Sequence, residues 1–324
     1  MASHRGRFQS ILVPLDGSSV AEQAVPVAAA LAERARCKVK LVLVHQTLLT
    51  IEPGSAYTKL ELAMQKADRD YLRSIAAPLR KRLGRLLSTA VLQGFVVPTL
   101  ARYAREVGAD LVVMTTHGRG GIRRAWLGSV TDQMIRTADV PILVVRAADG
   151  KRTTPPLEVK EILVPLDGSP LAEAALEPAA AFAALWDAEV SLVQVVHGVS
   201  LPSDPLLPFP TGYSDEVTQI RREAAQDYIQ DLAERLRESG VRSSGVAVLG
   251  NGVAETLLAL ARPGPISLMV VATHGRGGTR RLVLGSVADK LVRGAEVPLL
   301  VVRSTARPAG REQRSNAPAA VTVF

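Results

Sequence analysis

The sequence has few of the features that mark a secreted, disulfide-stabilised or membrane-spanning protein. Its single cysteine, Cys37, excludes an internal disulfide, and no Cys-x-x-Cys or Cys/His cluster suggests a zinc site. The longest apolar runs, such as Val39–Val44, fall far short of the roughly 20 residues that a membrane-spanning helix needs. Basic residues near the N-terminus are not followed by the apolar stretch of a secretory signal. We therefore expect a cytoplasmic protein without a membrane partner.

Aromatic residues are scarce as well, at 4% of the chain, although the formal net charge is +8. A basic surface can attract nucleic acids, membranes or phosphate-bearing small molecules. With so few aromatic rings, there is little material for the stacking platforms that bind single-stranded nucleic acids. The arginines are also spread along helical stretches together with acidic residues, for example at Arg34, Arg69 and Arg222. The composition therefore favours a small phosphate-bearing ligand over a nucleic acid.

Four sequence blocks occur twice in the same order, which identifies the chain as a duplication. The shift between the copies changes only from 151 to 157 positions. The paired blocks are ILVPLDGS at Ile11–Ser18 and Ile162–Ser169, THGRGG at Thr116–Gly121 and Thr273–Gly278, LGSV at Leu127–Val130 and Leu284–Val287, and DVPILVVR at Asp139–Arg146 with EVPLLVVR at Glu296–Arg303. We expect a first domain over residues 1–146, a linker over 147–160, a second domain over 161–303 and a disordered tail over 304–324.

Within each copy, short apolar runs alternate with stretches of helical periodicity. The runs predict strands at Ile11–Leu15, Val39–Val44, Ser88–Gln93, Asp110–Met114 and Pro141–Val145, and in the second copy at Ile162–Leu166, Val190–Val196, Gly245–Leu249, Leu268–Ala272 and Pro298–Val302. The helical stretches of the first copy are Val20–Arg36, Thr58–Leu83, Pro98–Val107 and Ser129–Thr137. Continuous Val/Ile/Leu runs between helices indicate strands buried on both faces of a parallel sheet. The expected fold is α/β, with two tandem open, doubly wound parallel sheets of five strands each.

Doubly wound sheets bind ligands beyond the carboxyl ends of their strands, where the strand order reverses. The first candidate there is Pro14-Leu15-Asp16-Gly17-Ser18, repeated as Pro165-Leu166-Asp167-Gly168-Ser169. A carboxylate at the end of the first strand can accept hydrogen bonds from ribose hydroxyls or help to hold a divalent metal ion. The alternative is that the aspartate or the serine simply caps the next helix.

The second candidate is a glycine-rich loop followed by a Gly-Ser pair. Its segments are Thr115–Gly121 with Gly128-Ser129, and Ala272–Gly278 with Gly285-Ser286. Glycines let the backbone approach phosphate groups closely, and the N-terminal N–H groups and dipole of the following helix favour anions. The spacing is not that of the GxxxxGK[ST] phosphate loop. The alternative is a flexible connector that ends in an ordinary serine N-cap.

Taken together, these motifs resemble the universal stress protein family, twice over, across nearly all of residues 7–146 and 158–303. ATP-binding members of that family carry Gly-x-x-Gly, nine residues, and then Gly-[Ser/Thr]. The matching residues are Gly118 with Gly128-Ser129, and Gly275 with Gly285-Ser286. The first glycine of the motif is replaced by Thr115 in one copy and by Ala272 in the other. Since a threonine side chain can crowd the ligand more than a methyl group, we expect the second copy to bind ATP at least as well as the first.

The resemblance also implies the remaining parts of the site. ATP is the implied cofactor, and Mg²⁺ can accompany it. Pro14, Asp16, Pro165 and Asp167 would contact the nucleotide, and Asp16 and Asp167 would also lie near the metal ion. The backbone after the second strand, at Gln46 and His197, would meet adenine, and the N–H groups of Val130 and Val287 would meet phosphate. In the family the last strand forms the dimer contact. The segments Pro141–Val145 and Pro298–Val302 are therefore expected to pack on each other within one chain, and the molecule can dimerise further.

Three functions remain to be separated. The first is an ATP-binding stress-response protein that is not an enzyme, or at most a slow ATPase, because no arginine finger or positioned base is evident. The second is a nucleotidyl transferase or ATP pyrophosphatase, but the SGGxDS and HIGH-type signatures of such enzymes are missing. The third is an interaction protein of the same fold that binds no nucleotide, an alternative that the Thr115 and Ala272 substitutions leave open.

Other side chains are expected to be structural. His45, His117, His197 and His274 lie near predicted strand ends, where a general base would be useful. A role in orienting the loops explains His117 and His274 better, because both lie inside the repeated motif. Cys37 is expected to pack in the core, and Trp126 and Trp186 to lie in the core or at an interface.

Overall fold

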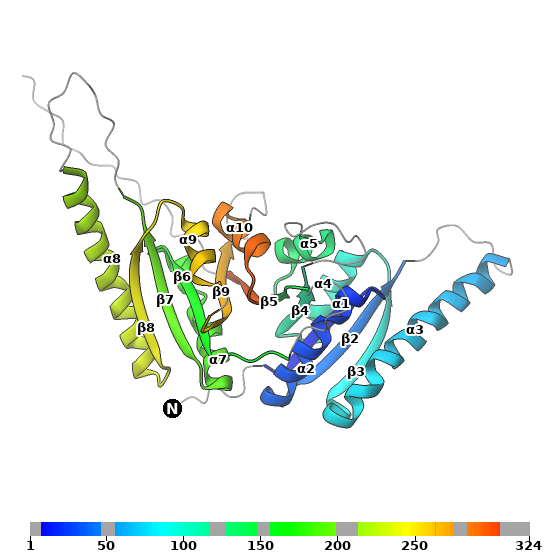
Figure 1. The fold of residues 1–324 in the computed structure, drawn as a ribbon. Coiled ribbons are helices and arrows are strands. Elements are labelled where there is room, and N and C mark those ends of the chain that lie inside the picture. The colour runs from blue at the N-terminus through cyan, green and yellow to red at the C-terminus, as the bar shows by residue number, and fades with distance from the viewer. Residues whose placement is uncertain are drawn as a thin grey trace, which may run out of the picture.

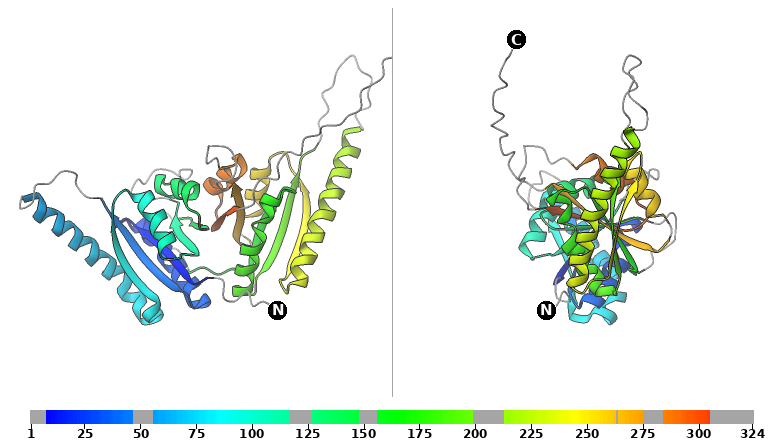
Figure 2. Two further views of the ribbon diagram at one scale, coloured as in Figure 1. Left: turned by 180° about the vertical axis from the view of Figure 1, so that it is seen from behind. Right: turned by 90° about the vertical axis from the view of Figure 1, so that its left-hand side faces the viewer.

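The computed structural model describes residues 8–46, 56–116, 127–147, 156–198, 213–262, 264–274 and 284–304. The two halves of the chain fold alike and diverge from a shared seam, with the long helices α3 (Ala56–Leu83) and α8 (Tyr213–Glu238) on the outer flanks (Figures 1 and 2). The glycine-rich loops that contain Gly118 and Gly275, together with His117, Trp126 and the predicted tail after residue 304, lie outside the described residues.

Strands and helices alternate through both halves, as the sequence pattern predicts. The first half contains β1 (Ser10–Leu15), α1 (Ser19–Glu22), α2 (Ala24–Ala35), β2 (Lys38–His45), α3, the 3-10 turn η2 (Gly84–Leu86), β3 (Leu87–Gln93), α4 (Val96–Glu106), β4 (Leu111–Thr115), α5 (Ser129–Thr137) and β5 (Ile142–Val145). The second half contains β6 (Glu161–Leu166), α6 (Pro170–Glu173), α7 (Leu176–Trp186), β7 (Glu189–Val196), α8, β8 (Ser243–Leu249), α9 (Val253–Leu260), β9 (Ile266–His274), α10 (Ser286–Gly294) and β10 (Leu299–Ser304). The predicted strands are confirmed to within two residues at each end.

The predicted helix Val20–Arg36 is the main local difference, because it is divided into α1 and α2 at Gln23. Proline explains the break. Pro26 has no N–H to donate to the carbonyl of Glu22, four residues earlier, and its ring would clash with that carbonyl in a continuous helix. The second half breaks in the same way between α6 and α7, where Pro178 follows Ala174 by four residues.

Five strands from each half form one continuous ten-stranded sheet in the order β3-β2-β1-β4-β5-β10-β9-β6-β7-β8. Within each half all neighbouring strands are parallel. The halves meet where β5 and β10 pair antiparallel, with Leu143 opposite Leu300 and Ile142 opposite Val301. The prediction that the two last strands pack on each other within the chain is therefore confirmed.

The sheet separates two apolar layers. One face packs against α2, α3, α7 and α8, whose buried side chains form a core that runs through both halves. The other face packs against α4, α5, α9 and α10 in a second core of the same kind. Because both faces are covered, the central strands are apolar on both sides, which explains the continuous Val/Ile/Leu runs of the sequence. Cys37 is buried in the first of these cores, as predicted.

Aromatic side chains also form contacts between the first and the second half of the chain. Phe182 of α7 is fully buried, with its ring centroid 5.1 Å from that of Phe8 in the first half and 5.8 Å from that of Trp186. The guanidinium of Arg34 on α2 lies 5.5 Å from the Trp186 ring and donates from Nε to the carbonyl oxygen of Leu185 at 2.5 Å. Trp186 is therefore an interface residue, one of the two roles that the sequence left open.

Candidate functional site

The strand order reverses between β1 and β4 in the first half and between β6 and β9 in the second. In the first half, β1 lies between β2 and β4. In the second half, β6 lies between β7 and β9. The predicted site residues gather here, because Asp16 follows β1, Gln46 follows β2 and Thr115 ends β4. In the second half, Asp167 follows β6 and His197 follows β7, and Ala272 lies two residues before the end of β9. Ligands of doubly wound sheets bind at such points.

Each candidate carboxylate shapes the turn in which it lies. Asp16 accepts hydrogen bonds at Oδ1 from the backbone N–H of Ser18 at 2.9 Å and from its hydroxyl at 2.6 Å. Ser18 Oγ in turn accepts from Ala21 N at 3.1 Å and caps α1. Gly17 between them has φ of 80°, a left-handed conformation that favours glycine. The capping interpretation is thus confirmed for Ser18, and a ligand role for Asp16 stays a prediction.

The same turn recurs in the second half with small differences in exposure. Asp167 Oδ1 accepts from the N–H of Ser169 at 3.0 Å and from its hydroxyl at 2.6 Å, and Gly168 has φ of 83°. Asp16 is half-buried, whereas Asp167 is exposed. Pro14 and Pro165, which precede them in the strands, are both half-buried.

The helices that begin at the Gly-Ser pairs have no side-chain cap among the described residues. The N-cap residues are Gly128 for α5 and Gly285 for α10, so the alternative of an ordinary serine N-cap is wrong. Ser129 and Ser286 are the first helical residues and are exposed, and Val130 and Val287 follow half-buried. N–H groups in a first helical turn have no partner within their helix. These helix starts therefore offer donors that an anion can accept.

The first helix start is held more firmly than the second. Gly128 N donates to Thr116 O at 2.5 Å, and Thr131 Oγ1 donates to Thr115 O at 2.8 Å, so α5 is fastened to the end of β4. The position of Thr131 is taken by Ala288 in α10, which has no hydroxyl to donate. Thr115 itself is buried, whereas Ala272 is half-buried. The two candidate sites are therefore built unequally.

A hydrogen-bonded tyrosine–glutamate pair lies beside each candidate carboxylate and was not predicted from the sequence. Tyr71 Oη donates to Glu22 Oε1 at 3.1 Å, and Tyr228 Oη donates to Glu173 Oε1 at 3.0 Å. Burial, together with the neighbouring carboxylates, raises the pKa of both phenols, so they stay protonated donors. The repeat could have revealed them, since identical residue types occupy matching positions in both copies. Each pair ties the long outer helix to the short helix that follows the candidate carboxylate.

His45, which ends β2, is enclosed by carboxylates instead of facing an open cleft. Its Nδ1 lies 2.6 Å from Asp68 Oδ2 and its Nε2 lies 2.8 Å from Glu61 Oε1, both on α3. Glu61 Oε1 also accepts from Gln65 Nε2 at 3.1 Å. His45 is 3% exposed and Glu61 is 8% exposed. With both ring nitrogens facing carboxylates, this arrangement favours the doubly protonated imidazolium, and His45 has a structural role.

The second half has no such cluster at the matching positions. Val196 ends β7 as His45 ends β2, and Ala225 lies three residues before Tyr228 as Asp68 lies three before Tyr71. Val196 and Ala225 are buried together with Ala247 in a small apolar core. Thr218 occupies the position of Glu61. An ionic cluster in one half is thus replaced in the other by uncharged residues, two of which pack in an apolar core.

The His45 cluster predicts a pH dependence of stability. Burial alone would lower the pKa of His45, but its hydrogen bonds to Asp68 and Glu61 and their negative charges raise it above the ordinary value of 6.5. Because the folded state binds this proton more tightly, the stabilisation is fully present below pH 6.5 and is lost as the pH rises through the folded-state pKa. We expect the melting temperature in scanning calorimetry to fall over that range. A chain carrying His45→Val, Glu61→Thr and Asp68→Ala should fall less steeply, and equal slopes would contradict the prediction.

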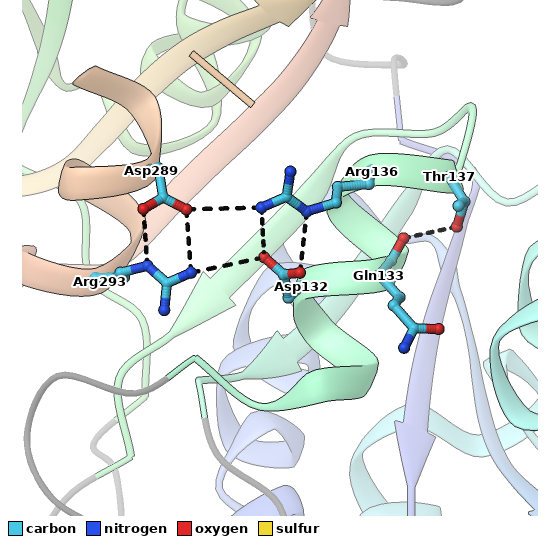
Figure 3. A network of polar contacts seen from close by, with 6 residues as sticks. All are labelled: Asp132, Gln133, Arg136, Thr137, Asp289 and Arg293. Atoms are coloured by element: carbon cyan, nitrogen blue, oxygen red, sulfur yellow. Dashed lines mark hydrogen bonds and ion pairs between the residues drawn. The ribbon is translucent and has the colours of Figure 1, made fainter. Parts of the chain in front are cut away.

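The helices of the two candidate sites are linked by four charged side chains across the seam (Figure 3). Arg136 forms two hydrogen bonds to Asp132 within α5, at 2.9 and 3.0 Å, and Arg293 forms two to Asp289 within α10, at 2.8 and 3.1 Å. Between the helices, Arg136 Nη2 lies 3.7 Å from Asp289 Oδ1 and Arg293 Nη2 lies 4.0 Å from Asp132 Oδ1. The Arg293 guanidinium, aided by Arg136, lowers the pKa of Asp289. Charges of opposite sign therefore alternate around this ring.

Two broader properties bear on the possible ligands. Among the described residues, no group of three or more His, Cys, Asp or Glu side chains is arranged to hold a metal ion. Asp16 and Asp167 could therefore contribute to a metal site only together with ligands from elsewhere, such as the phosphates of a nucleotide. In the described parts of the chain, no helix is both long and apolar enough to cross a membrane.

Comparison with known proteins adds independent information. The model of the universal stress protein family matches residues 7–146 and again residues 158–303. One universal stress protein of Mycobacterium tuberculosis is 31% identical over 214 residues, which cover 64% of this chain and 66% of that protein. Another from the same organism is 30% identical over 319 residues, which cover 92% of this chain and 96% of the relative.

Solved structures show the same fold over nearly the whole chain. A universal stress protein from Archaeoglobus fulgidus superposes with a TM-score of 0.63 at 15% identity, covering 94% of this chain and 99% of that one. A functionally unknown protein from Pseudomonas aeruginosa superposes with a TM-score of 0.60 at 16% identity, covering 94% and 95%. At these identities the likeness concerns the fold alone.

Proposed function

We propose, from the premise that this chain belongs to the universal stress protein family, that it binds adenine nucleotides at two related sites. Family membership supports a role in the stress response. In each half, the site would lie at the strand reversal between β1 and β4 or between β6 and β9.

The observation that carries this proposal is the convergence of three kinds of group at one end of the sheet. A carboxylate follows the first strand, a backbone segment follows the second, and a glycine-capped helix begins after the fourth. Because these strands are neighbours and parallel, their carboxyl ends lie at the same edge. The same combination occurs twice, although the two halves differ at many other positions.

The backbone and side-chain groups at these two sites suit a nucleoside triphosphate. Uncapped first-turn N–H groups of α5 and α10 can donate to phosphate oxygens, and the exposed hydroxyls of Ser129 and Ser286 can add one donor each. A Cβ atom added at Gly285 would meet nothing within 4 Å, so open space borders that helix start. Asp16 and Asp167 would face the ribose or a phosphate-bound Mg²⁺, and Gln46 and His197 are exposed where the base would lie.

Binding without rapid turnover is the expected activity. Among the described residues near the two sites, His45 is occupied by Glu61 and Asp68, which leaves it unsuited to activating water. The four arginine and aspartate side chains at the seam are engaged with one another. ATP would then act as a retained structural or signalling ligand. Because α5 is fastened to β4 and Thr115 replaces a motif glycine, the first site is expected to be the more restricted of the two.

Replacing Gly285 with valine tests the second site. The glycine has φ of −57°, which valine tolerates, and the added side chain would enter open space, so the fold should be kept. The valine methyl groups would occupy the space that a phosphate needs, and we expect ATP binding at this site to weaken about 10- to 100-fold, which corresponds to about 1.4–2.8 kcal/mol. Isothermal titration calorimetry with ATP and magnesium measures the affinity and the number of sites.

Gly128→Val is the matched variant in the first half, and the double variant should bind ATP more weakly at both sites. Mass spectrometry of small molecules released from the purified protein identifies any retained nucleotide. If no nucleotide is released and ATP neither binds nor shifts the melting temperature, the nucleotide proposal is wrong. The same fold would then serve as an interaction protein, the alternative that Thr115 and Ala272 leave open.

A further inference from the structure

The two outer strands of the sheet, β3 and β8, differ in how far side chains of the neighbouring helix bond to their outward backbone groups. An exposed strand edge presents unpaired N–H and C=O groups that can pair with another chain. On β8, side chains of α8 form hydrogen bonds to three of these groups. Ala247 N donates to Gln226 Oε1 at 2.8 Å, and the carbonyl of Gly245 accepts from Gln226 Nε2 and Gln230 Nε2, both at 3.1 Å. Arg237 Nη1 covers the carbonyl of Ser243 at 2.9 Å. The outer edge of β8 is thus closed by side chains between Ser243 and Ala247.

Glycine makes this closure possible. A Cβ atom at Gly245 would lie 2.3 Å from Ile229 Cγ2 and 3.0 Å from the Ile229 carbonyl oxygen. Only a residue without a side chain lets α8 approach β8 so closely, and this approach brings the two glutamines within reach of the strand. Gly245 and the two glutamines therefore act together.

None of these three residues is present at the matching positions of the first half. His45 pairs with Gln93 as Val196 pairs with Leu249, so Thr89 matches Gly245 and Val91 matches Ala247. Counted from Tyr71 and Tyr228, Arg69 and Arg73 match the two glutamines. A threonine side chain at position 89 keeps α3 from approaching as α8 does. Among the described residues, the outward carbonyl of Thr89 and N–H of Val91 have no hydrogen-bond partner.

The helix beside this open edge carries a basic stripe. Lys66, Arg69, Arg73 and Arg80 recur at helical spacing on the side of α3 that matches the capping side of α8, and all four are exposed. One of them, Arg73, forms an exposed ion pair with Asp70 at 2.8 Å, which a competing carboxylate can replace at little cost. In α8, Glu223, Gln226, Gln230 and Arg237 occupy these positions. The first half therefore combines free backbone groups with an excess of positive charge.

We propose that the outer edge of β3 binds an extended acidic segment of a partner protein by strand addition. The backbone of the segment would pair with Thr89 and Val91, as in other complexes formed at a sheet edge. Its carboxylates would meet the guanidinium groups of Arg69 and Arg73. The edge of β8, closed and less basic, would not bind the same segment. This surface lies four strands from the seam and is independent of the nucleotide proposal.

The probe is a fluorescein-labelled peptide of eight residues in which valine and glutamate alternate. Fluorescence anisotropy with the full chain measures its dissociation constant. The variant Arg69→Gln/Arg73→Gln/Thr89→Gly transfers the closing residues of the second half to the first, and we expect it to weaken binding at least 10-fold. Gln226→Ala/Gln230→Ala in the second half is the matched control, and it should not weaken binding.

Two further measurements separate strand addition from simple attraction of charge. A peptide of the same sequence, N-methylated at every residue, keeps its carboxylates but cannot donate from its backbone, and it should bind at least 10-fold more weakly. A single-stranded oligonucleotide with the same number of negative charges should not displace the unmethylated peptide at equal concentration. Equal binding of the methylated peptide, displacement by the oligonucleotide, or unchanged affinity in the three-residue variant would each overturn the proposal. Failure of ATP binding would leave it unaffected.

Discussion

Replacing His45 alone with valine is expected to lower the free energy of unfolding by about 3 kcal/mol, because removal of one member of a buried ionic cluster leaves its partners without compensation. Without the imidazolium, Glu61 would remain buried with a negative charge beside Asp68. The Glu61 side chain is 11% exposed and the Asp68 side chain is 26% exposed. We place the loss at the lower end of the usual range for buried pairs because Asp68 is partly hydrated. Urea unfolding followed by circular dichroism measures the change.

The triple variant His45→Val/Glu61→Thr/Asp68→Ala is the decisive control. It copies the residues Val196, Thr218 and Ala225 of the second half, where Val196 and Ala225 are buried with Ala247 in a small apolar core. Replacing a whole buried ionic cluster by apolar residues is often neutral for stability. We therefore expect the triple variant to recover most of the loss at pH 6.5 or above. A triple variant less stable than His45→Val would show that the cluster stabilises the fold by more than mutual compensation.

The substitution Phe182→Ala is expected to be the most damaging one at the junction of the halves, with a loss of about 3–5 kcal/mol in unfolding free energy. Phe182 is completely buried and contacts Phe8 from the first half as well as Trp186. Its removal would leave a cavity between segments that come from different repeats. We expect calorimetry to show a lower melting temperature and a broader transition, since the halves would unfold less cooperatively.

Phe182→Leu is the matched control for this cavity. Leu31 occupies the corresponding position in α2 and is also fully buried, so leucine is compatible with this environment. We expect a loss of about 1 kcal/mol, with the single sharp transition retained. If Phe182→Ala and Phe182→Leu lowered stability equally, the aromatic ring would have no special part in joining the halves.

The regular elements of the fold could be predicted from the sequence because local patterns determine them. Each buried strand is a continuous apolar run, and the repeat tests each assignment twice. The prolines at positions 26 and 178 could also have indicated the helix breaks, since a missing N–H is visible in the sequence. The place of Asp16 followed from the rule that ligands bind beyond the carboxyl ends of parallel strands, whereas Gln46 was implied by the family resemblance alone.

The contacts that distinguish the two halves could not be predicted in this way. The cluster of His45, Glu61 and Asp68 depends on how the outer helix lies against a strand end, and the sequence separates these residues by 16 and 23 positions. Closure of the β8 edge depends on the approach distance of a helix, which only the packing at Gly245 reveals. Comparing the copies position by position would have pointed to both, because these are places where the repeat changes chemical character.

The antiparallel seam between β5 and β10 has a consequence for how the two halves can evolve. In a dimer of identical subunits, each substitution appears on both sides of the twofold interface. Here the facing strands are encoded separately and covalent linkage keeps them together at any protein concentration. A change such as histidine in one half and valine in the other therefore affects one site alone. The seam frees the halves to specialise while their one-to-one ratio stays fixed by the chain itself.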